Sequence, residues 1–207
     1  MTALPKQRYT IEEYIALEKG ARERYEYFDG EVFCMAGASL RHTRISANAF
    51  RRISDKISGR NCEAFSTEAR IKVPTAPPYR YPDASVVCGE VKTEMFRGQE
   101  MVVNPILLVE VLSPSTSAYD LHDKFLEYQS IDTFEEYLVI SQEAPQITQY
   151  IRQADHKWLR MDTVDMDGEI TLESLDITLT VAEIYERVSF PAPASAHEPP
   201  PPASGGQ

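Results

Sequence analysis

The chain is predicted to fold as a mixed α/β or α+β domain. Apolar residues recur at helical spacing through residues 40–58, which predicts a long amphipathic helix. Two almost uninterrupted apolar runs, at residues 84–88 and 106–112, are typical of central strands that are covered on both faces. Because strand-like segments lie on both sides of the helix in the sequence, helices and strands are expected to share one core.

The N-terminal segment predicts a short helix and a β-hairpin. Thr10 and Glu13 have the spacing of a capping box, so a helix is expected to begin there and to end near Gly20. Residues 24–28 and 31–35 alternate in the manner of strands. The Asp-Gly pair between them is typical of a two-residue hairpin turn.

Strands and loops follow the long helix. Residues 74–82 are rich in proline and residues 113–117 in serine, so both segments are expected to be loops. The strand-like segments of this part of the chain are residues 62–65, 68–73, 84–88, 101–103 and 106–112.

A second helix is predicted over residues 118–130, with an N-cap at Thr116 or Ser117. Its apolar side chains are expected to face the core, and they are Leu121, Phe125, Leu126 and Tyr128.

Further strands and a short helix complete the domain. The pair Asp167-Gly168 is typical of a hairpin turn. Thr180 and Glu183 have the spacing of a second capping box, which predicts a last helix to about residue 188. The strand-like segments here are residues 136–140, 146–152, 158–163 and 169–172.

Length and composition fit one domain. The chain has 207 residues, 43 % of them hydrophobic and 26 % charged, so residues 1–190 are expected to form a single domain. Residues 191–207 consist mainly of Pro, Ala, Ser and Gly and are expected to form a disordered tail. The sequence has neither an apolar stretch of membrane-spanning length nor the apolar core of a signal peptide, so a cytoplasmic location without membrane contact is expected.

The three cysteines, Cys34, Cys62 and Cys88, are far apart and odd in number. They lack metal-ligand spacing and predict no disulfide framework. Cys34 and Cys88 lie in apolar runs and are expected to be small core residues.

The net charge is −11, with 32 acidic residues against 21 basic ones. This balance counts against a passive, nonspecific nucleic-acid binder, which is normally basic, but it permits an enzyme that contacts a few phosphates. Basic residues concentrate in and just after the long helix, where they form either a solvated helix face or a local contact surface. They are Arg41, Arg44, Arg51, Arg52, Lys56 and Arg60.

Two acidic residues stand at or inside the apolar strands. Asp83 opens the run at residues 84–88, and Glu110 interrupts the run at residues 106–112. An ionised carboxylate is costly to bury alone, and a cation such as Mg²⁺ or Mn²⁺ suits two converging carboxylates. The alternatives are that Asp83 caps a turn after Pro82 and that Glu110 pairs with a core arginine. Together the two acids favour a metal site.

Lys124 lies on the helix predicted to follow these strands. It shares a side of that helix with Leu121 and Tyr128, so it can lean back toward the strand ends. Alternatively, it is a surface lysine that pairs with Glu127 or Asp120. In the first case, two acids, a lysine and a divalent metal form a site that cleaves phosphodiester bonds.

A series of short motifs extends this pattern along most of the chain. In order, they are Tyr25-Glu26-Tyr27-Phe28-Asp29-Gly30-Glu31, His42, Tyr81-Pro82-Asp83, Leu108-Val109-Glu110-Val111-Leu112-Ser113-Pro114-Ser115-Thr116, Asp120, Asp123-Lys124, Tyr128 and Glu136-Tyr137. In this combination the chain resembles, over residues 10–188, the Uma-two family of endonucleases, which belongs to the PD-(D/E)XK nuclease superfamily.

The resemblance implies a restriction-endonuclease-like fold with a central mixed sheet flanked by helices. By position, Asp83 is the aspartate of the first motif and Glu110 the acid of the second. The superfamily pattern places a lysine two residues after that acid, where this chain has Leu112, so Lys124 takes the role of the lysine. Glu26 is expected either to be an additional catalytic acid or to be an ordinary exposed strand residue.

The implied activity is Mg²⁺- or Mn²⁺-dependent hydrolysis of phosphodiester bonds in DNA. Asp83, Glu110 and the backbone carbonyl of Val111 are expected to hold the metal. Lys124 is expected to position the attacking water and to stabilise the developing negative charge.

His42 and Arg41 are the expected substrate contacts, although His42 can equally be a helix-start residue without a chemical role. A homodimer is also implied, since two sites cleave two strands more readily than one. The alternative function is a non-catalytic metal- or nucleic-acid-binding regulatory module on the same fold, which the acidic net charge favours.

Overall fold

The computed structural model describes residues 8–21, 23–35, 37–74, 79–113 and 120–190. The predicted tail, residues 191–207, lies outside these residues, and so does the predicted N-cap at Thr116 or Ser117. In the described part of the chain, no helix is both long and apolar enough to cross a membrane.

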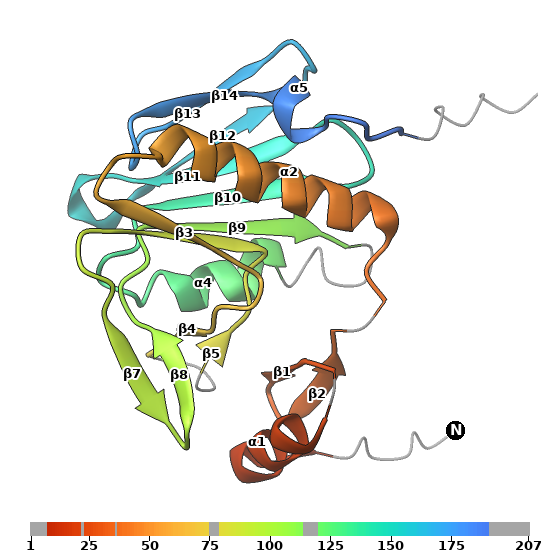
Figure 1. Cartoon of the computed structure of the whole chain (residues 1–207), viewed down its shortest axis with the longest axis vertical. Helices are drawn as coiled ribbons and strands as arrows, with labels where there is room; N and C mark the ends of the chain where they lie inside the picture. The colour runs from red at the N-terminus through yellow and green to blue at the C-terminus, as the bar shows by residue number, and fades with distance from the viewer. Residues whose placement is uncertain (1–7, 22, 36, 75–78, 114–119, 191–207) are drawn as a thin grey trace, which may run out of the picture.

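A six-stranded mixed sheet forms the centre of the domain (Figure 1). Its middle strands, β9 (Leu107–Leu112) and β10 (Glu136–Ser141), are parallel, and all other neighbours are antiparallel. The strand order is β12 (Trp158–Thr163), β11 (Ile147–Arg152), β10, β9, β6 (Ala84–Cys88) and β3 (Cys62–Ser66). The two predicted central strands are thus confirmed as β6 and β9, which lie side by side.

The predicted long helix is confirmed as α2 (Leu40–Ile57), which covers one face of this sheet (Figure 1). Ile45, Ala49 and Ile53 are fully buried in one apolar cluster with residues of β6 and β9. Ser39 caps the helix by accepting a hydrogen bond from the backbone N–H of His42. The helical spacing read from the sequence therefore marks the buried side of α2.

The C-terminal segment packs beside α2. Strands β13 (Glu169–Leu172) and β14 (Ile177–Thr180) form a hairpin, which leads into α5 (Val181–Ile184). The second capping box is confirmed at Thr180, whose side chain accepts a hydrogen bond from the N–H of Glu183.

Asp167-Gly168 forms a turn, but not the predicted hairpin turn between β12 and β13. The two strands around it belong to different sheets, since β12 pairs with β11 and β13 pairs with β14. No strand was predicted over the residues of β14, so β12 was the only predicted neighbour that could pair with β13.

A short helical segment covers the opposite face of the central sheet. It begins as a π-helical turn, Asp120–Lys124, and continues as α4 (Phe125–Tyr128). Tyr128 is fully buried, and Phe125 stacks on an aromatic ring of β10. The predicted burial of Leu126 is wrong, because it is 54 % exposed. Phe125 and Tyr128 are three residues apart and face the sheet, whereas Leu126 lies on a different side of the helix.

The N-terminal unit consists of α1 (Ile11–Gly20) and the hairpin of β1 (Tyr25–Phe28) and β2 (Glu31–Cys34). It lies at one end of the domain (Figure 1). The first capping box is confirmed: the Thr10 hydroxyl accepts from the N–H of Glu13, and the Glu13 carboxylate accepts from the N–H of Thr10.

The predicted hairpin turn between β1 and β2 is also confirmed. Its residues Asp29 and Gly30 have φ angles of 42° and 81°. Both lie in the left-handed region that a two-residue type I′ turn requires, which explains the Asp-Gly pair.

A second sheet of four strands packs against the N-terminal unit. Its order is β5 (Tyr79–Arg80), β4 (Ile71–Lys72), β8 (Gln99–Val102) and β7 (Thr93–Phe96). The strand predicted over residues 68–73 is therefore confined to β4, and β5 lies inside the segment predicted to be a proline-rich loop. Glu18 of α1 is buried and accepts hydrogen bonds from the hydroxyls of Tyr79 and Tyr81, which anchors α1 to this region.

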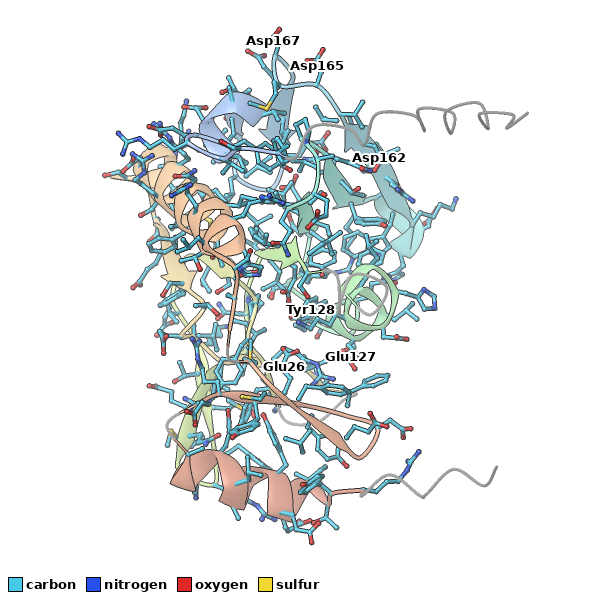
Figure 2. All side chains as sticks on the ribbon, turned by 90° about the vertical axis from the view of Figure 1, so that its right-hand side faces the viewer. Glu26, Glu127, Tyr128, Asp162, Asp165 and Asp167 are labelled. Atoms are coloured by element: carbon cyan, nitrogen blue, oxygen red, sulfur yellow. A yellow bond between two sulfur atoms is a disulfide. The ribbon has the colours of Figure 1, made fainter. Side chains whose placement is uncertain are left out.

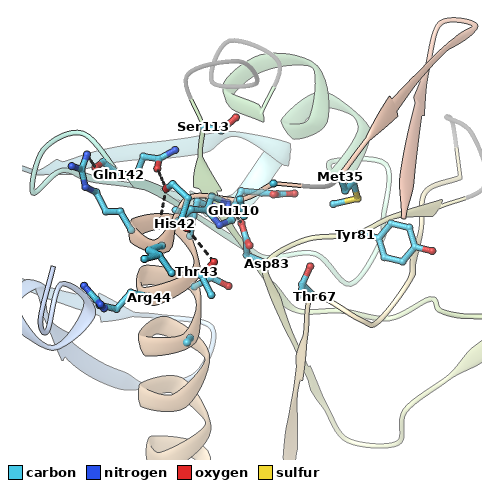
Figure 3. Close-up of a pocket in the computed structure, with 18 of the residues that line it drawn as sticks. Met35, His42, Thr43, Arg44, Thr67, Tyr81, Asp83, Glu110, Ser113 and Gln142 are labelled. Carbon is cyan, nitrogen blue, oxygen red and sulfur yellow. Dashed lines mark hydrogen bonds and ion pairs between the residues drawn. The ribbon is translucent and has the colours of Figure 1, made fainter. Parts of the chain in front are cut away.

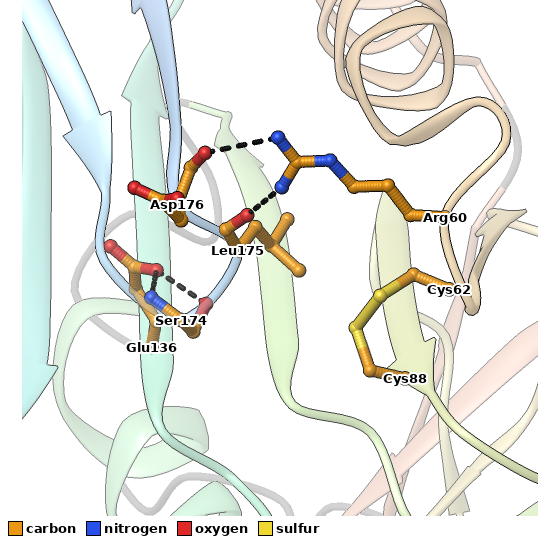
Figure 4. The surroundings of a disulfide bond; sticks show 7 residues. All are labelled: Arg60, Cys62, Cys88, Glu136, Ser174, Leu175 and Asp176. Atoms are coloured by element: carbon orange, nitrogen blue, oxygen red, sulfur yellow. Dashed lines mark hydrogen bonds between the residues drawn. A yellow bond between two sulfur atoms is a disulfide. The ribbon is translucent and has the colours of Figure 1, made fainter.

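A disulfide bond joins Cys62 of β3 to Cys88 of β6 (Figure 4). The expectation of no disulfide is wrong, because the two cysteines are 26 positions apart in sequence but directly opposite in the antiparallel register. Cys34 is free and exposed rather than a core residue, because β2 belongs to a two-stranded hairpin with an open side.

Arg60, just before β3, donates hydrogen bonds to the carbonyls of Leu175 and Asp176 and so ties β3 to the C-terminal hairpin.

Candidate active site

Asp83 and Glu110 are brought together by the pairing of β6 with β9. The antiparallel register places Ala84 opposite Val109, so the next residues outward, Asp83 and Glu110, face each other on one side of the sheet. An Asp83 carboxylate oxygen accepts a hydrogen bond of 2.7 Å from the N–H of Val111. Both acids line one pocket, as Figure 3 shows.

Glu110 is only 4 % exposed. Its Oε1 atom accepts a hydrogen bond from the Tyr128 hydroxyl (2.8 Å) and lies 3.2 Å from the Lys124 ammonium. Burial and the nearby carboxylates raise the pKa of Tyr128 well above its usual value, so its hydroxyl keeps the proton that it donates. The structure thus gives Glu110 a lysine as a charged partner, where the alternative expected a core arginine.

Lys124 bridges two acids instead of lying at the surface. Its Nζ atom is 3.1 Å from Glu26 Oε1 and 3.2 Å from Glu110 Oε1, and the residue is 4 % exposed. The alternative of a surface lysine is wrong, because Lys124 is buried. Of its two expected partners, Glu127 binds Arg80, and the side chain of Asp120 lies outside the part of the chain that the structure describes. Glu26 is also buried, at 8 % exposure, so it is not an ordinary exposed strand residue.

Arg80 holds the elements that carry Glu26 and Lys124, and the sequence did not single it out. Its guanidinium binds both carboxylate oxygens of Glu127 at 2.7 Å and donates to the backbone carbonyl of Tyr27 at 2.6 Å. Figure 2 shows Glu26, Glu127 and Tyr128 approaching one another from the hairpin and the helix. Arg80 is completely buried. The available signal was an arginine placed between two tyrosines directly before Pro82 and Asp83.

The two predicted substrate contacts lie at different depths. His42, in the first turn of α2, has its Nε2 atom 3.6 Å from Asp83 Oδ2. Arg41 lies on the rim, where it donates to the backbone carbonyl of Gln142 (3.1 Å) and approaches Glu143 (3.6 Å). His42 is thus brought to the acids, and Arg41 is not.

Acidic side chains gather at the bottom of the site. Glu26 and Glu110 both bind the ammonium of Lys124, and Asp83 lies beside His42 and the N–H of Val111. Burial raises the pKa of Asp83, although His42, the N–H of Val111 and Lys124 act in the opposite direction. Burial therefore makes the charged form of Asp83 less favourable than it is in water.

The pocket is an open hollow of about 1120 Å³. Its walls come from β2, the first turns of α2 and the ends of β6 and β9, and the exposed side chains of Phe33 and Leu40 lie on its rim. The pocket is therefore open enough for a large substrate to approach Asp83 and Glu110.

The donor atoms suit Mg²⁺ or Mn²⁺. Among the described residues, no group of three His, Cys, Asp or Glu side chains is arranged to hold a metal ion. Mg²⁺, however, is usually bound through one or two carboxylates and keeps several of its waters. Asp83 and Glu110, which place hard carboxylate oxygens on one side of the sheet, fit that kind of site.

The fold is that of restriction-endonuclease-like nucleases, with a central mixed sheet flanked by helices. It is similar to the crystal structure of a "putative nuclease belonging to DUF820" from Anabaena variabilis ATCC 29413, with a TM-score of 0.68 and 17 % identity. That comparison covers 85 % of this chain and 97 % of the other.

Within this class, residues 11–182 match the model of the Uma2 family, which is described as "Putative restriction endonuclease". The chain belongs to the Uma2 family, the Uma-two family indicated by its motifs. Two uncharacterized proteins of Synechocystis sp. (strain ATCC 27184 / PCC 6803 / Kazusa) are similar to it. Slr1290 is 32 % identical, covering 90 % of this chain and 96 % of its own, and sll1609 is 33 % identical, covering 81 % and 94 %.

Proposed function

We propose that this protein is an endonuclease that hydrolyses phosphodiester bonds of DNA with Mg²⁺ or Mn²⁺ held by Asp83 and Glu110. The observation that carries the proposal is that Asp83 and Glu110 lie opposite each other at the ends of β6 and β9 and line one open pocket, with Lys124 bound to Glu110. Two converging carboxylates with hard oxygen ligands suit a divalent cation of this kind. Membership of a family of nucleases supports the same chemistry.

When bound, the metal supplies Lewis-acid polarisation of the phosphate and a lower pKa for an attacking water. Asp83 and Glu110 would hold it, together with the backbone carbonyl of Val111. Lys124, oriented by Glu26 and Glu110, would stabilise the negative charge that develops on the phosphate.

Other residues of the site orient these groups. Tyr128 donates a hydrogen bond to Glu110 and so fixes the direction of its carboxylate. His42, next to Asp83, is placed to orient a phosphate or a water. The predicted roles of Arg41 in substrate binding, the homodimer and the cytoplasmic location stay predictions.

The direct test is cleavage of labelled single-stranded and duplex DNA by the purified chain in the presence of Mg²⁺. Cleavage is expected to need the metal, to stop when EDTA is added and to return with excess Mg²⁺ or Mn²⁺. The matched control is Asp83→Asn protein prepared identically, because Asn keeps an acceptor for the Val111 N–H but loses the charge. Metal binding without cleavage of any substrate would favour the regulatory module over the enzyme.

A further inference from the structure

A second hollow, of about 330 Å³, opens beside the active-site pocket. Arg44 and Ala47 of α2 line both hollows, so the two are neighbours along one side of the helix. Arg44, Asn48 and Arg51 lie four and three residues apart, which places them on one face of α2. Arg44 therefore stands between the active-site pocket and Arg51 on this side of α2.

The far wall of this hollow is held rigidly against α2. Arg187, in the segment after α5, is 86 % exposed in its side chain, and its backbone carbonyl accepts a hydrogen bond of 2.8 Å from Arg44. The buried side-chain amide of Asn48 donates to the carbonyls of Ile184 and Glu186. These bonds fix the backbone from which the guanidinium of Arg187 projects beside those of α2.

The hollow is positively charged in a protein that is acidic as a whole. Three arginines and one glutamate line it, a formal charge of +2 (three minus one), while the whole chain has −11. The glutamate, Glu186, is bound by Arg51 at 2.7 Å and Arg52 at 2.8 Å, which lowers its pKa and keeps it ionised. The hydrogen bond from Arg44 goes to a neutral carbonyl, which does not neutralise the charge of Arg44.

We propose that this arginine groove, defined by Arg44, Arg51 and Arg187, binds the phosphate backbone of the nucleic acid whose scissile bond lies at Asp83 and Glu110. The proposal rests on the nuclease function proposed above. It adds the direction in which the bound nucleic acid extends from the active site. Guanidinium groups suit phosphates because their planar forks donate two parallel hydrogen bonds. Since the net charge of the chain repels nucleic acid, this local positive strip supplies the attraction.

The test is the affinity of fluorescein-labelled single-stranded and duplex DNA, measured by anisotropy in EDTA over a series of salt concentrations. EDTA prevents metal-dependent cleavage, so the assay reports binding alone. The double variant Arg51→Gln/Arg187→Gln is expected to bind roughly three- to tenfold more weakly, and the slope of log Kd against log salt is expected to fall by about 2. Arg44 is left intact because it also lines the active-site pocket and holds the backbone of Arg187.

The matched control is Arg97→Gln/Arg160→Gln. Both of these arginines are exposed and paired with one acid each, Glu12 and Asp162, so the change in net charge is the same. The control is expected to keep the wild-type slope, and thermal melts confirm that both variants fold.

An equal loss of affinity in both double variants, or no loss in either, would overturn the groove, as would a wild type that binds no DNA. If the wild type cleaves DNA but its binding does not depend on Arg51 and Arg187, the groove is wrong and the nuclease function stands. If binding depends on the groove but no cleavage occurs, the groove stands and the nuclease function fails.

Discussion

A Glu110→Gln variant is expected to cleave DNA on the order of 10³-fold more slowly than the wild type while keeping its fold. The substitution removes one of the two metal-holding charges but retains an oxygen that can accept the hydrogen bond from Tyr128. It also lowers the repulsion among Glu26, Asp83 and Glu110, and Glu26 stays in place as a partner of Lys124, so the free energy of unfolding should not decrease. Initial cleavage rates at saturating Mg²⁺, together with thermal melts, measure both effects.

Lys124→Ala is the informative comparison for this variant. A protonated lysine is not a metal ligand, so its loss should leave metal affinity in place and lower only the cleavage rate. Equal metal-dependent cleavage by the wild type, Glu110→Gln and Lys124→Ala would identify a contaminating nuclease and contradict the assignment.

Arg80→Met is expected to lower the free energy of unfolding by about 3–5 kcal/mol. It would leave the Glu127 carboxylate, whose side chain is 14 % exposed, without its two-pronged partner and the Tyr27 carbonyl without its donor. Urea denaturation followed by circular dichroism measures the loss. The partial replacement Arg80→Lys should be intermediate, because an ammonium keeps the charge but not the fork.

Two controls distinguish the loss of the Arg80–Glu127 ion pair from the loss of any one positive charge. Arg97→Met removes an exposed arginine that pairs with Glu12, and it should leave the denaturation midpoint nearly unchanged. The double variant Arg80→Met/Glu127→Leu removes both charges of the pair and should recover much of the stability. A fold that tolerates Arg80→Met as well as Arg97→Met would show that Arg80 does not hold Glu26 and Lys124 in place.

Local sequence patterns predicted those parts of the fold that depend on neighbouring residues. The phase of α2, the two capping boxes and the Asp-Gly turn each follow from residues within a few positions of one another. Glu110 could be identified because a carboxylate inside an apolar strand needs a compensating partner wherever that strand lies.

The remaining features depend on pairings between distant segments. Cys62 and Cys88 gave no signal because only the β3–β6 register places them opposite each other. Arg80 was hidden in a proline-rich segment, and its partners come from the N-terminal hairpin and α4. The helix spacing allowed Lys124 to lie either at the surface or against the strand ends. The position of β1 decides between the two, since Glu26 of that strand binds the ammonium.

The central claim, that Asp83 and Glu110 hold one divalent ion, is tested most directly by calorimetry of Mn²⁺ binding. The wild type should show a saturable site that is lost in Asp83→Asn. The double variant Asp165→Asn/Asp167→Asn should retain it, because these acids are exposed on the β12–β13 loop, far from Glu26 and Tyr128 in Figure 2. Unchanged Mn²⁺ binding in Asp83→Asn, or loss of binding only in the Asp165/Asp167 variant, would contradict the account.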